Sequence, residues 1–291
     1  MSYIGIDVSA YQETIDWAKV KAGGIQFAIL KIIRKDLNRD KQFEANWSGC
    51  KANGLTIQGV YNYSYATTVT KARNDARKVA EILNGRETMV WLDVEDNCQR
   101  GLRSKLIDII NAYGDVIRSY GLAFGVYTGK SFYNSYIKPY GGVKYPMWIA
   151  AYGKNKGNMD LKYQPQVENM VGWQYTSKGT VNGINGNVDM NIWYRELNEL
   201  QTSYETHNNP YVEPTRTLYK TFPCMRGDDV KWLQTELIYH KCLSATNAKG
   251  KSNIDGILGN DTASAIGVFQ KRVGITVDCK AGKVTREYLK R

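Results

Sequence analysis

The sequence predicts an α/β protein: an irregular barrel of the (β/α)8 type, followed by a second, small and mainly α-helical C-terminal domain. Three observations lead to this prediction. Apolar, strand-like segments alternate with helical patterns through the first two-thirds of the chain, these segments number eight, and a polar, proline-marked stretch separates them from a shorter helical region. A doubly wound α/β sheet is the rival architecture, because it shows the same alternation.

The expected strands are short and mostly apolar, as strands buried on both faces of a parallel sheet are. They cover residues 3–9, 27–33, 56–65, 88–95, 123–128, 146–152, 171–175 and 187–193. Helical patterns cover residues 17–22, 71–83 and 103–120, and each is followed by a glycine that can end a helix, namely Gly23, Gly85 and Gly121. Helices later in the series are expected to be short or absent.

Two domains are expected to share the chain. Residues 1–200 form the barrel, residues 201–217 form a linker, and residues 218–291 form the C-terminal domain. The C-terminal domain contains an internal repeat, in which Asp255-Gly256-x-x-Gly259-x-x-Thr262 matches Asp278-Cys279-x-x-Gly282-x-x-Thr285. Since Asp or Thr can cap a helix and glycine permits a tight loop, we interpret the repeat as structural.

Composition argues against several classes of protein. No segment approaches the roughly 18 to 20 consecutive apolar residues that a membrane span requires, so membrane insertion is not expected. Five widely and irregularly spaced cysteines fit neither a disulfide framework nor a zinc site, and reduced thiols are expected. His207 and His240 are too few for a histidine-rich zinc centre, and no phosphate-binding glycine loop is present. We expect no metal and no cofactor.

Positive charge is concentrated in the C-terminal domain. The chain carries a net charge of +11, and residues 215–291 hold 14 basic and 7 acidic residues. This surplus suits an anionic partner, such as nucleic acid, a membrane surface or an acidic wall polymer. A solvated, lysine-rich surface is the alternative interpretation.

Asp93 and Glu95 end the apolar segment Met89-Val90-Trp91-Leu92 and form the most informative pair in the sequence. Strand residues at i and i+2 share a face and lie roughly 6.5 to 7 Å apart, so both carboxyls would project from the carboxyl end of the strand. Glycoside cleavage needs one protonated carboxyl and a second negative group, and close like charges separate two pKa values in this way. The pair could instead cap a helix or bind a cation.

Acids, amides and aromatic residues also occur on the other expected strands. Asp7 lies on the first strand and Asp189 on the eighth. The remaining candidates for substrate binding are Tyr61, Tyr63, Tyr127, Trp148, Tyr152, Trp173, Gln174 and Tyr175. Aromatic faces stack on sugar rings while acids and amides bind hydroxyl groups, so four carboxylates ringed by aromatic residues indicate a carbohydrate site.

In order and spacing, the motifs of residues 1–197 resemble the family 25 glycoside hydrolases, which are muramidases. The motifs are Asp7-Val8-Ser9-x-x-Gln12, Asp93-Val94-Glu95, Trp148-Ile149-Ala150-x-Tyr152, Trp173-Gln174-Tyr175 and Val188-Asp189-x-Asn191. The resemblance implies cleavage of the β-1,4 bond between N-acetylmuramic acid and N-acetylglucosamine in peptidoglycan. By motif position, Glu95 would be the proton donor and Asp93 the charge-stabilising partner, with Asp7 and Asp189 shaping the site.

Two mechanisms that retain configuration remain open. Asp93 could steer the 2-acetamido group of the sugar towards the anomeric carbon, or it could form a covalent bond itself. The chain departs from the family pattern after the second strand, where Lys31-Ile32-Ile33-Arg34-Lys35 replaces a commoner Lys-Ala/Thr-Thr/Ser-Glu-Gly. Asn62 also occupies a position where histidine is frequent.

Residues 218–290 resemble the type 1 peptidoglycan-binding domain. The resemblance lies in Gly227-Asp228-Asp229-Val230-x-x-Leu233-Gln234, the Asp-Gly-x-x-Gly-x-x-Thr loop and Val268-Phe269-Gln270. Cys279 replaces the usual glycine of the second loop. By this resemblance the domain anchors the enzyme on its substrate, and anionic wall polymers are a possible additional partner, while nucleic acid is not expected.

The expected protein is therefore a phage endolysin that accumulates in the host cytoplasm without a signal peptide and then reaches the cell wall. A bacterial autolysin would look the same. A chitinase-like hydrolase on the same barrel and a non-catalytic wall-binding protein are the rivals, and the oligomeric state stays open.

Overall fold

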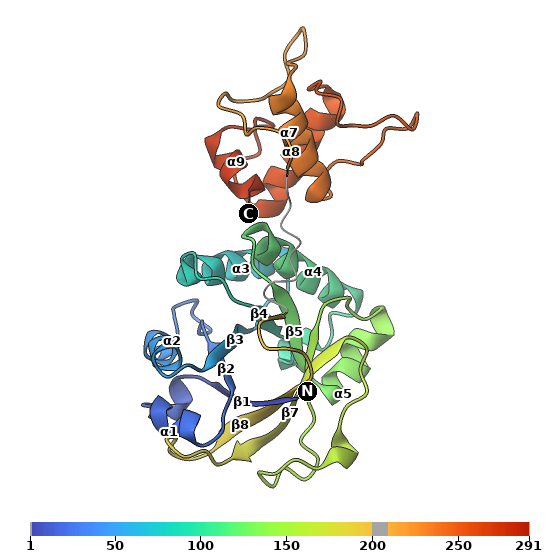
Figure 1. The fold of residues 1–291 in the computed structure, drawn as a ribbon. Coiled ribbons are helices and arrows are strands. Elements are labelled where there is room, and N and C mark those ends of the chain that lie inside the picture. Colours follow the sequence, from blue (N-terminus) through green and yellow to red (C-terminus); the bar gives the residue numbers. More distant parts are fainter. Residues whose placement is uncertain (1, 200–208, 291) are drawn as a thin grey trace. The chain divides into compact units, whose positions relative to one another are not determined.

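The structure, a computed structural model, describes residues 2–199 and 209–290. Residues 201–208 of the expected linker lie outside this description. The described chain forms two compact units, one containing a β-barrel and the other a group of helices (Figure 1).

The first unit is a closed barrel of eight strands in sequence order. The strands are β1 (Tyr3–Val8), β2 (Phe27–Lys31), β3 (Thr56–Tyr63), β4 (Val90–Asp93), β5 (Phe124–Gly129), β6 (Met147–Ala150), β7 (Met170–Gly179) and β8 (Val188–Trp193). All eight expected strands are present, and closure of the sheet excludes the doubly wound alternative. Strands β1 to β7 are parallel, whereas β8 runs antiparallel to both β7 and β1.

Helices cover the first half of the barrel and become short in the second half. They are α1 (Trp17–Ala22), α2 (Phe43–Ala52), α3 (Val69–Leu83), α4 (Ser104–Ser119) and α5 (Lys130–Phe132). Side-chain oxygens of Asp16 and Thr68 cap α1 and α3, and Asn84 ends α3 in a left-handed conformation. Helix α2 was not among the predicted patterns, since it buries only Phe43, Asn46 and Cys50 and one of these is polar.

Four large aromatic side chains from alternate strands fill the barrel interior. Phe27, Trp91, Trp148 and Trp193 come from β2, β4, β6 and β8, and at most 1% of each side chain is exposed. The ring centroids of Trp91 lie 6.0 Å from those of Trp148 and 5.4 Å from those of Trp193, in edge-to-face arrangements. A layer built from alternate strands is the usual way to pack a barrel of this kind.

Glycines on the odd strands make room for this aromatic layer. They are Gly5, Gly59, Gly125 and Gly172, and a Cβ atom on any of them would lie 2.3 to 2.5 Å from a ring of the layer. In each case the residue two positions further along the strand, on the same face, is Asp7, Tyr61, Tyr127 or Gln174. The aromatic layer therefore lies directly below a ring of polar side chains.

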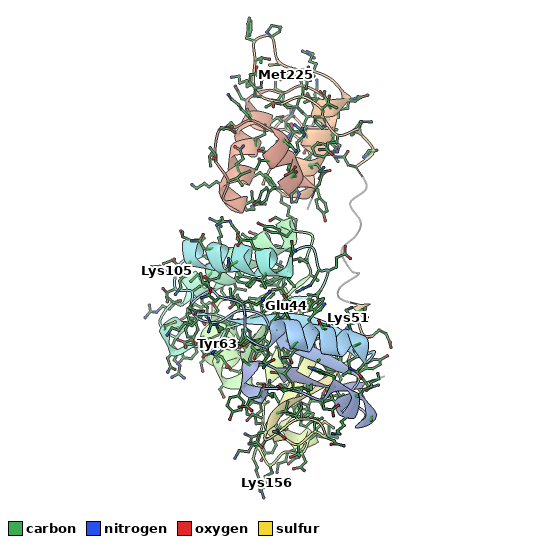
Figure 2. The ribbon with its side chains drawn as sticks, turned by 90° about the vertical axis from the view of Figure 1, so that its left-hand side faces the viewer. Glu44, Lys51, Tyr63, Lys105, Lys156 and Met225 are labelled. Atoms are coloured by element: carbon green, nitrogen blue, oxygen red, sulfur yellow. The ribbon has the colours of Figure 1, made fainter. Side chains whose placement is uncertain are left out.

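The described residues of the second unit form three helices around their own core. They are α7 (Asp228–Tyr239), α8 (Asn260–Val273) and α9 (Lys283–Leu289), and Leu218, Leu233, Ile266 and Phe269 are among the fully buried residues between them. Met225, labelled in Figure 2, packs against this core. The prediction of a small, mainly helical C-terminal region is confirmed.

Each half of the sequence repeat forms a loop held by one glutamine. The Nε2 atom of Gln234 donates to Asp255 at 2.8 Å and its Oε1 accepts from the Gly256 amide at 2.9 Å. Gln270 makes the equivalent bonds, to Asp278 at 2.7 Å and from the Cys279 amide at 2.9 Å. Cys279 adopts a φ of 56°, close to the 71° of Gly256, so the second loop keeps its geometry despite the missing glycine.

Replacing Gly125 by alanine should destabilise the barrel. The new Cβ would lie 2.3 Å from Cζ3 of Trp91, and overpacking of this kind costs about 1–3 kcal/mol. The measurement is the free energy of unfolding from urea denaturation of the full chain. Gly101→Ala is the matched control, because nothing lies within 4 Å of that position. Equal stability of the two variants would contradict the packing of the aromatic layer.

Candidate active site

A cavity of about 190 Å³ opens above the aromatic layer, at the carboxyl ends of the parallel strands. All eight strands or the residues that directly follow them contribute to it. Its lining residues are Asp7, Lys31, Tyr61, Tyr63, Asp93, Glu95, Tyr127, Trp148, Tyr152, Gln174 and Asp189. The structure therefore brings together the four carboxyls that the sequence singled out.

Asp93 is the last residue of β4, and Glu95 follows just beyond the strand. The chain stays bonded to β5 through Val94, whose amide donates to the Tyr127 carbonyl at 2.9 Å. Asp93 is only 5% exposed, and its Oδ1 atom has no hydrogen-bond partner among the described residues. Asp93 and Glu95 line the same cavity. The sequence predicted that the strand would include Glu95, but β4 ends at Asp93.

Asp7 and Asp189 face each other directly across β1 and β8. Asp189 lies near the start of β8, so in an all-parallel barrel it would belong to the opposite rim. Because β8 is antiparallel, its start meets the carboxyl end of β1. The reversed strand is what adds the fourth carboxyl to the site.

A network of amide groups fixes Asp7. Its Oδ2 atom accepts from Gln174 Nε2 at 2.7 Å and from Asn191 Nδ2 at 2.8 Å. Trp148 Nε1 donates to Asn191 at 2.8 Å, and the hydroxyl groups of Tyr127 and Tyr152 donate to Gln174. The side-chain oxygens of Gln174 and Asn191 therefore already accept hydrogen bonds. Both amides can contact Asp7 only through their N–H groups, so the Asp7 carboxyl group acts as the acceptor.

Burial raises the pKa of all four carboxyl groups. The pKa of Asp7 rises to about 6, even though two amide hydrogen bonds oppose the effect. Desolvation and then the charges of Asp7 and Glu95 raise the pKa of Asp189 to about 8. Desolvation also raises the pKa of Asp93 and of Glu95, helped at Asp93 by the charge of Glu95 and opposed there by Lys31. The cavity consequently favours the protonated form of its carboxyl groups, and Asp189 in particular is expected to keep its proton at neutral pH.

Two of the predicted sugar-binding residues lie elsewhere. Gln174 lines the cavity, but its neighbours Trp173 and Tyr175 point to the other side of β7 and do not line it. Trp173 is fully buried and donates its indole N–H to the Ala151 carbonyl at 2.9 Å. Trp148 lines the cavity as part of its floor and is only 1% exposed, so it offers little face for stacking.

The prediction of site residues omitted Lys31 and Asn191. Lys31 is the last residue of β2 and lines the cavity, and Asn191 fixes Asp7 from β8. Both were detectable in the sequence. Lys31 ends its strand as Asp93 does, and Asn191 lies two positions after Asp189 on the same strand face.

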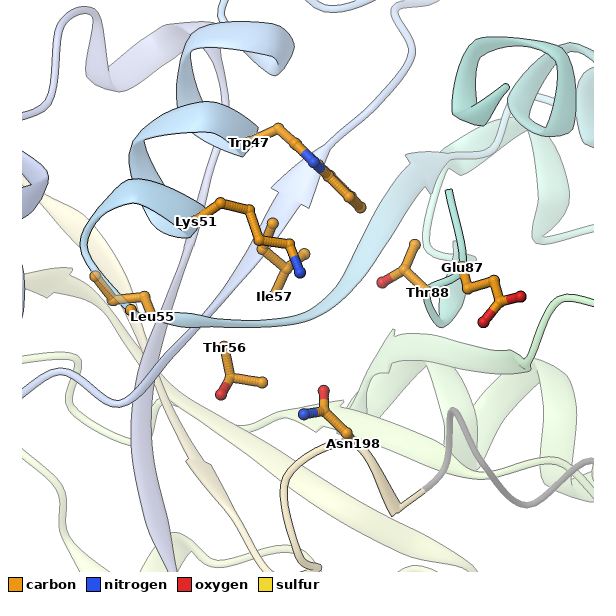
Figure 3. A pocket seen from close by; sticks show the side chains of 9 residues that line it. Trp47, Lys51, Leu55, Thr56, Ile57, Glu87, Thr88 and Asn198 are labelled. Carbon is orange, nitrogen blue, oxygen red and sulfur yellow. The ribbon is translucent and has the colours of Figure 1, made fainter. Parts of the chain in front are cut away.

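A second hollow, of about 320 Å³, lies beside the opposite ends of β3 and β4 (Figure 3). Trp47 and Lys51 project towards it from α2, and Glu87 and Thr88 lie on the segment that leads into β4. It is larger than the acidic cavity but contains a single carboxylate, Glu87, among its lining residues. Of the two pockets described, only the acidic cavity, which Asp7, Asp93, Glu95 and Asp189 line, contains the two carboxyls that glycoside cleavage needs.

Comparison with known proteins agrees with this geometry. The sequence profile of the glycosyl hydrolases family 25 matches residues 6–184, and that of a putative peptidoglycan binding domain matches residues 226–289. The chain therefore belongs to glycosyl hydrolase family 25. It is a glycoside hydrolase joined to a peptidoglycan-binding domain, which is the class of lysozyme that the sequence motifs predict.

Individual relatives cover one or both units. An autolytic lysozyme of Clostridium acetobutylicum is 28% identical over 288 residues, which are 97% of this chain and 76% of the relative. The protein YegX of Escherichia coli K12 is 32% identical over 207 residues, 68% of this chain and 71% of the relative. The catalytic domain of endolysin ply40 from Listeria monocytogenes bacteriophage P40 shares the fold, with a TM-score of 0.59, 23% identity, and coverage of 70% and 98% of the two chains.

Replacing Asp189 by asparagine should stabilise the protein at alkaline pH relative to acidic pH. Asp189 has a pKa of about 8 in the folded protein, against an ordinary value of 3.8 that we take for the unfolded chain. Its protonated form therefore stabilises the fold fully below about pH 4, and this stabilisation is lost as the pH rises to about 8. The variant escapes this loss, which we expect to be on the order of 1–3 kcal/mol after screening in the open cavity. Urea denaturation at pH 4 and pH 8 measures it.

Asp96→Asn is the control with the opposite sign. Hydrogen bonds from the Cys98 amide lower the pKa of Asp96, so this carboxyl group loses its stabilising contribution as the pH falls. A stability difference between Asp189→Asn and wild type that does not change with pH would contradict the raised pKa of Asp189.

Proposed function

We propose that this chain is a lytic muramidase that hydrolyses the β-1,4 bond between N-acetylmuramic acid and N-acetylglucosamine in bacterial peptidoglycan. The observation that carries the proposal is the enclosed Asp93–Glu95 pair, which shares one cavity with Asp7 and Asp189. Membership of glycosyl hydrolase family 25 and the adjoining peptidoglycan-binding domain support the same substrate.

In this proposal Glu95 protonates the glycosidic oxygen as the bond breaks. Burial raises the pKa of Glu95, which keeps the proton available, and Glu95 is less enclosed than Asp93 and so closer to an entering substrate. Asp93 stabilises the positive charge that develops at the anomeric carbon. It does so by orienting the 2-acetamido group of the sugar or by forming a covalent bond, and either route retains configuration.

The tyrosines of the cavity are the proposed contacts to the sugar rings. Tyr61, Tyr63, Tyr127 and Tyr152 line it together with Gln174. Tyr63, which is labelled in Figure 2, is the last residue of β3 and is half-buried, so part of its ring remains open to a ligand. Asp7 and Asp189 complete the site by shaping its charge, and Trp148 closes the bottom.

We further propose that residues 218–291 hold the enzyme on the wall, that residues 201–217 link the two domains, and that residues 1–200 carry the catalysis. A domain bound to peptidoglycan raises the local concentration of substrate at the barrel. The 14 basic and 7 acidic residues of 215–291 would add attraction to anionic wall polymers, and this attraction would weaken as salt rises.

The proposed setting is phage-induced lysis, with the enzyme stored in the host cytoplasm. All five cysteines are free thiols, which suits folding in a reducing compartment. Among the described helices, none is long and apolar enough to cross a membrane. A bacterial autolysin is the second candidate, favoured by the autolytic lysozyme that aligns with 97% of this chain.

Glu95→Gln should reduce the hydrolysis of purified cell walls by on the order of 100-fold or more, because the amide keeps the size of the side chain but cannot donate the proton. Turbidity loss and release of reducing ends measure the rate. Glu81→Gln, on the exposed surface of α3, is the matched control and should retain wild-type activity.

Activity of Glu95→Gln near that of Glu81→Gln would refute the role of Glu95. Reducing-end analysis of the wild-type digest tests the bond itself. Muramic acid reducing ends are expected, whereas N-acetylglucosamine ends would indicate the chitinase-like alternative, and an inactive wild type would indicate a non-catalytic wall-binding protein.

A further inference from the structure

The three tryptophans of the aromatic layer use their indole N–H groups differently. Trp91 donates to the backbone carbonyl of Gln58 at 3.4 Å, and Nε1 of Trp193 has no hydrogen-bond partner among the described residues. Trp148 donates to the side-chain oxygen of Asn191 at 2.8 Å. Trp148 is therefore the one tryptophan of this layer whose N–H group joins the polar network of the acid cavity.

The bond from Trp148 determines which way the Asn191 amide faces. An indole nitrogen can only donate a hydrogen bond, so the oxygen of Asn191 must be the atom that faces Trp148. The amide nitrogen of Asn191 then faces the cavity, and it donates to Oδ2 of Asp7 at 2.8 Å. Gln174, the second amide at Asp7, is oriented by tyrosine hydroxyls, which are able to donate or to accept. The direction of the network is consequently set by Trp148.

Packing holds this chain of hydrogen bonds in place. The ring centroid of Trp148 lies 4.4 Å from that of Tyr127 and 6.0 Å from that of Trp91, and only 1% of the Trp148 residue is exposed. Asn191 is fully buried, so its amide has no solvent with which to exchange partners. Neither the indole nor the amide can turn away without leaving a buried polar group unpaired, which is costly.

A donor with a fixed direction favours the charged form of Asp7. A hydrogen bond from an amide N–H group stabilises the negative charge of the carboxylate that accepts it. If Asn191 were free to turn, its oxygen could instead accept from the protonated carboxyl group and favour that form. Burial raises the pKa of Asp7 to about 6, and the hydrogen bond from Asn191 is the largest influence that opposes this rise.

We propose that Trp148 and Asn191 are positioning residues that hold Asp7 as a carboxylate of fixed orientation in the acid cavity, with Trp148 acting through its indole N–H group. Tryptophan serves at position 148 to direct a hydrogen bond, and not to stack on a sugar ring. The inference deepens the proposed function, on which its consequence for hydrolysis rests, because it makes Asp7 the fixed anion beside Asp93 and Glu95. The ionisation of Asp7 itself can be measured without substrate.

The other charged and titratable groups around Asp7 stay in place throughout the test. Asp189 lies opposite Asp7 in the register of β1 and β8. The groups that share the cavity with this pair are Lys31, Tyr61, Tyr63, Asp93, Glu95, Tyr127 and Tyr152. Since wild type and the variants below keep all of them, a difference in the titration of Asp7 reports on the hydrogen bonds from Asn191 and Trp148.

The first test compares wild type with Trp148→Phe and Trp193→Phe in the full-length protein. Trp148→Phe keeps an aromatic ring in the layer but removes the N–H group. In carbon-13 NMR titration of the substrate-free protein, with the signal assigned through Asp7→Asn, Asp7 should ionise about one pH unit higher in Trp148→Phe than in wild type. Trp193→Phe makes the same change in the same layer and should leave the Asp7 titration unchanged, because Nε1 of Trp193 binds nothing.

A second variant shows whether Trp148 acts through Asn191, and it keeps the inference testable if Trp148→Phe does not fold. Asn191→Leu has a similar shape but no donor, so it should raise the pH at which Asp7 ionises by at least as much as Trp148→Phe does. In the Asn191→Leu background, Trp148→Phe should add no further shift. The proposal is wrong if Asp7 titrates alike in wild type and Asn191→Leu, or if the shifts of the two variants add.

The pH profile of hydrolysis separates positioning from a general loss of structure. The acidic limb of the kcat/KM profile on purified walls should move up by about one pH unit in Trp148→Phe and stay in place in Trp193→Phe. A rate that falls equally at every pH in Trp148→Phe would contradict the proposal. A shifted Asp7 titration with a wild-type pH profile would confirm that Trp148 holds Asp7 and refute the part of Asp7 in hydrolysis. Glu95→Gln tests the proposed function separately, so the two failures are distinguishable.

Discussion

Inside the barrel, four aromatic side chains pack against four glycines, and the environment of the acid cavity above them depends on this packing. Trp91 and its neighbours occupy the space that side chains on the odd strands would otherwise take. The barrel is consequently closed to water immediately below the acids. Desolvation is the first cause of the raised pKa of Asp7, Asp93, Glu95 and Asp189, so the chemistry of the site depends on the packing below it.

Concentrating four largely buried carboxyls in one cavity costs stability, and the structure compensates for part of this cost. Two amides that can only donate stabilise the charged form of Asp7, and Lys31 opposes the burial of charge on Asp93. Burial and the charges of Asp7 and Glu95 raise the pKa of Asp189, which opposes Asp7 directly in the register. Asp189 therefore costs stability at alkaline pH.

Much of this fold and site could be predicted from the sequence, because hydrophobic alternation reports which strand faces are buried. The eight strands followed from apolar segments bounded by turns and helical patterns, and the grouping of Asp7, Asp93, Glu95 and Asp189 followed from their places on the strands and in the family motifs. The reversal of β8 could not be predicted, since an apolar strand reads alike in both directions. The same alternation places Trp173 and Tyr175 on the face of β7 opposite Gln174, so the structure does not bring them to the cavity that Gln174 lines.

Burial above the aromatic layer should keep at least one carboxyl of the acid cavity protonated at neutral pH. Carbon-13 NMR titration of every aspartate and glutamate carboxyl in the substrate-free, wild-type protein tests it most directly. We expect at least one carboxyl of the cavity to remain protonated above pH 6, with the Asp189 signal titrating near pH 8. Titration of all four cavity carboxyls near their ordinary values, about 4, would contradict it.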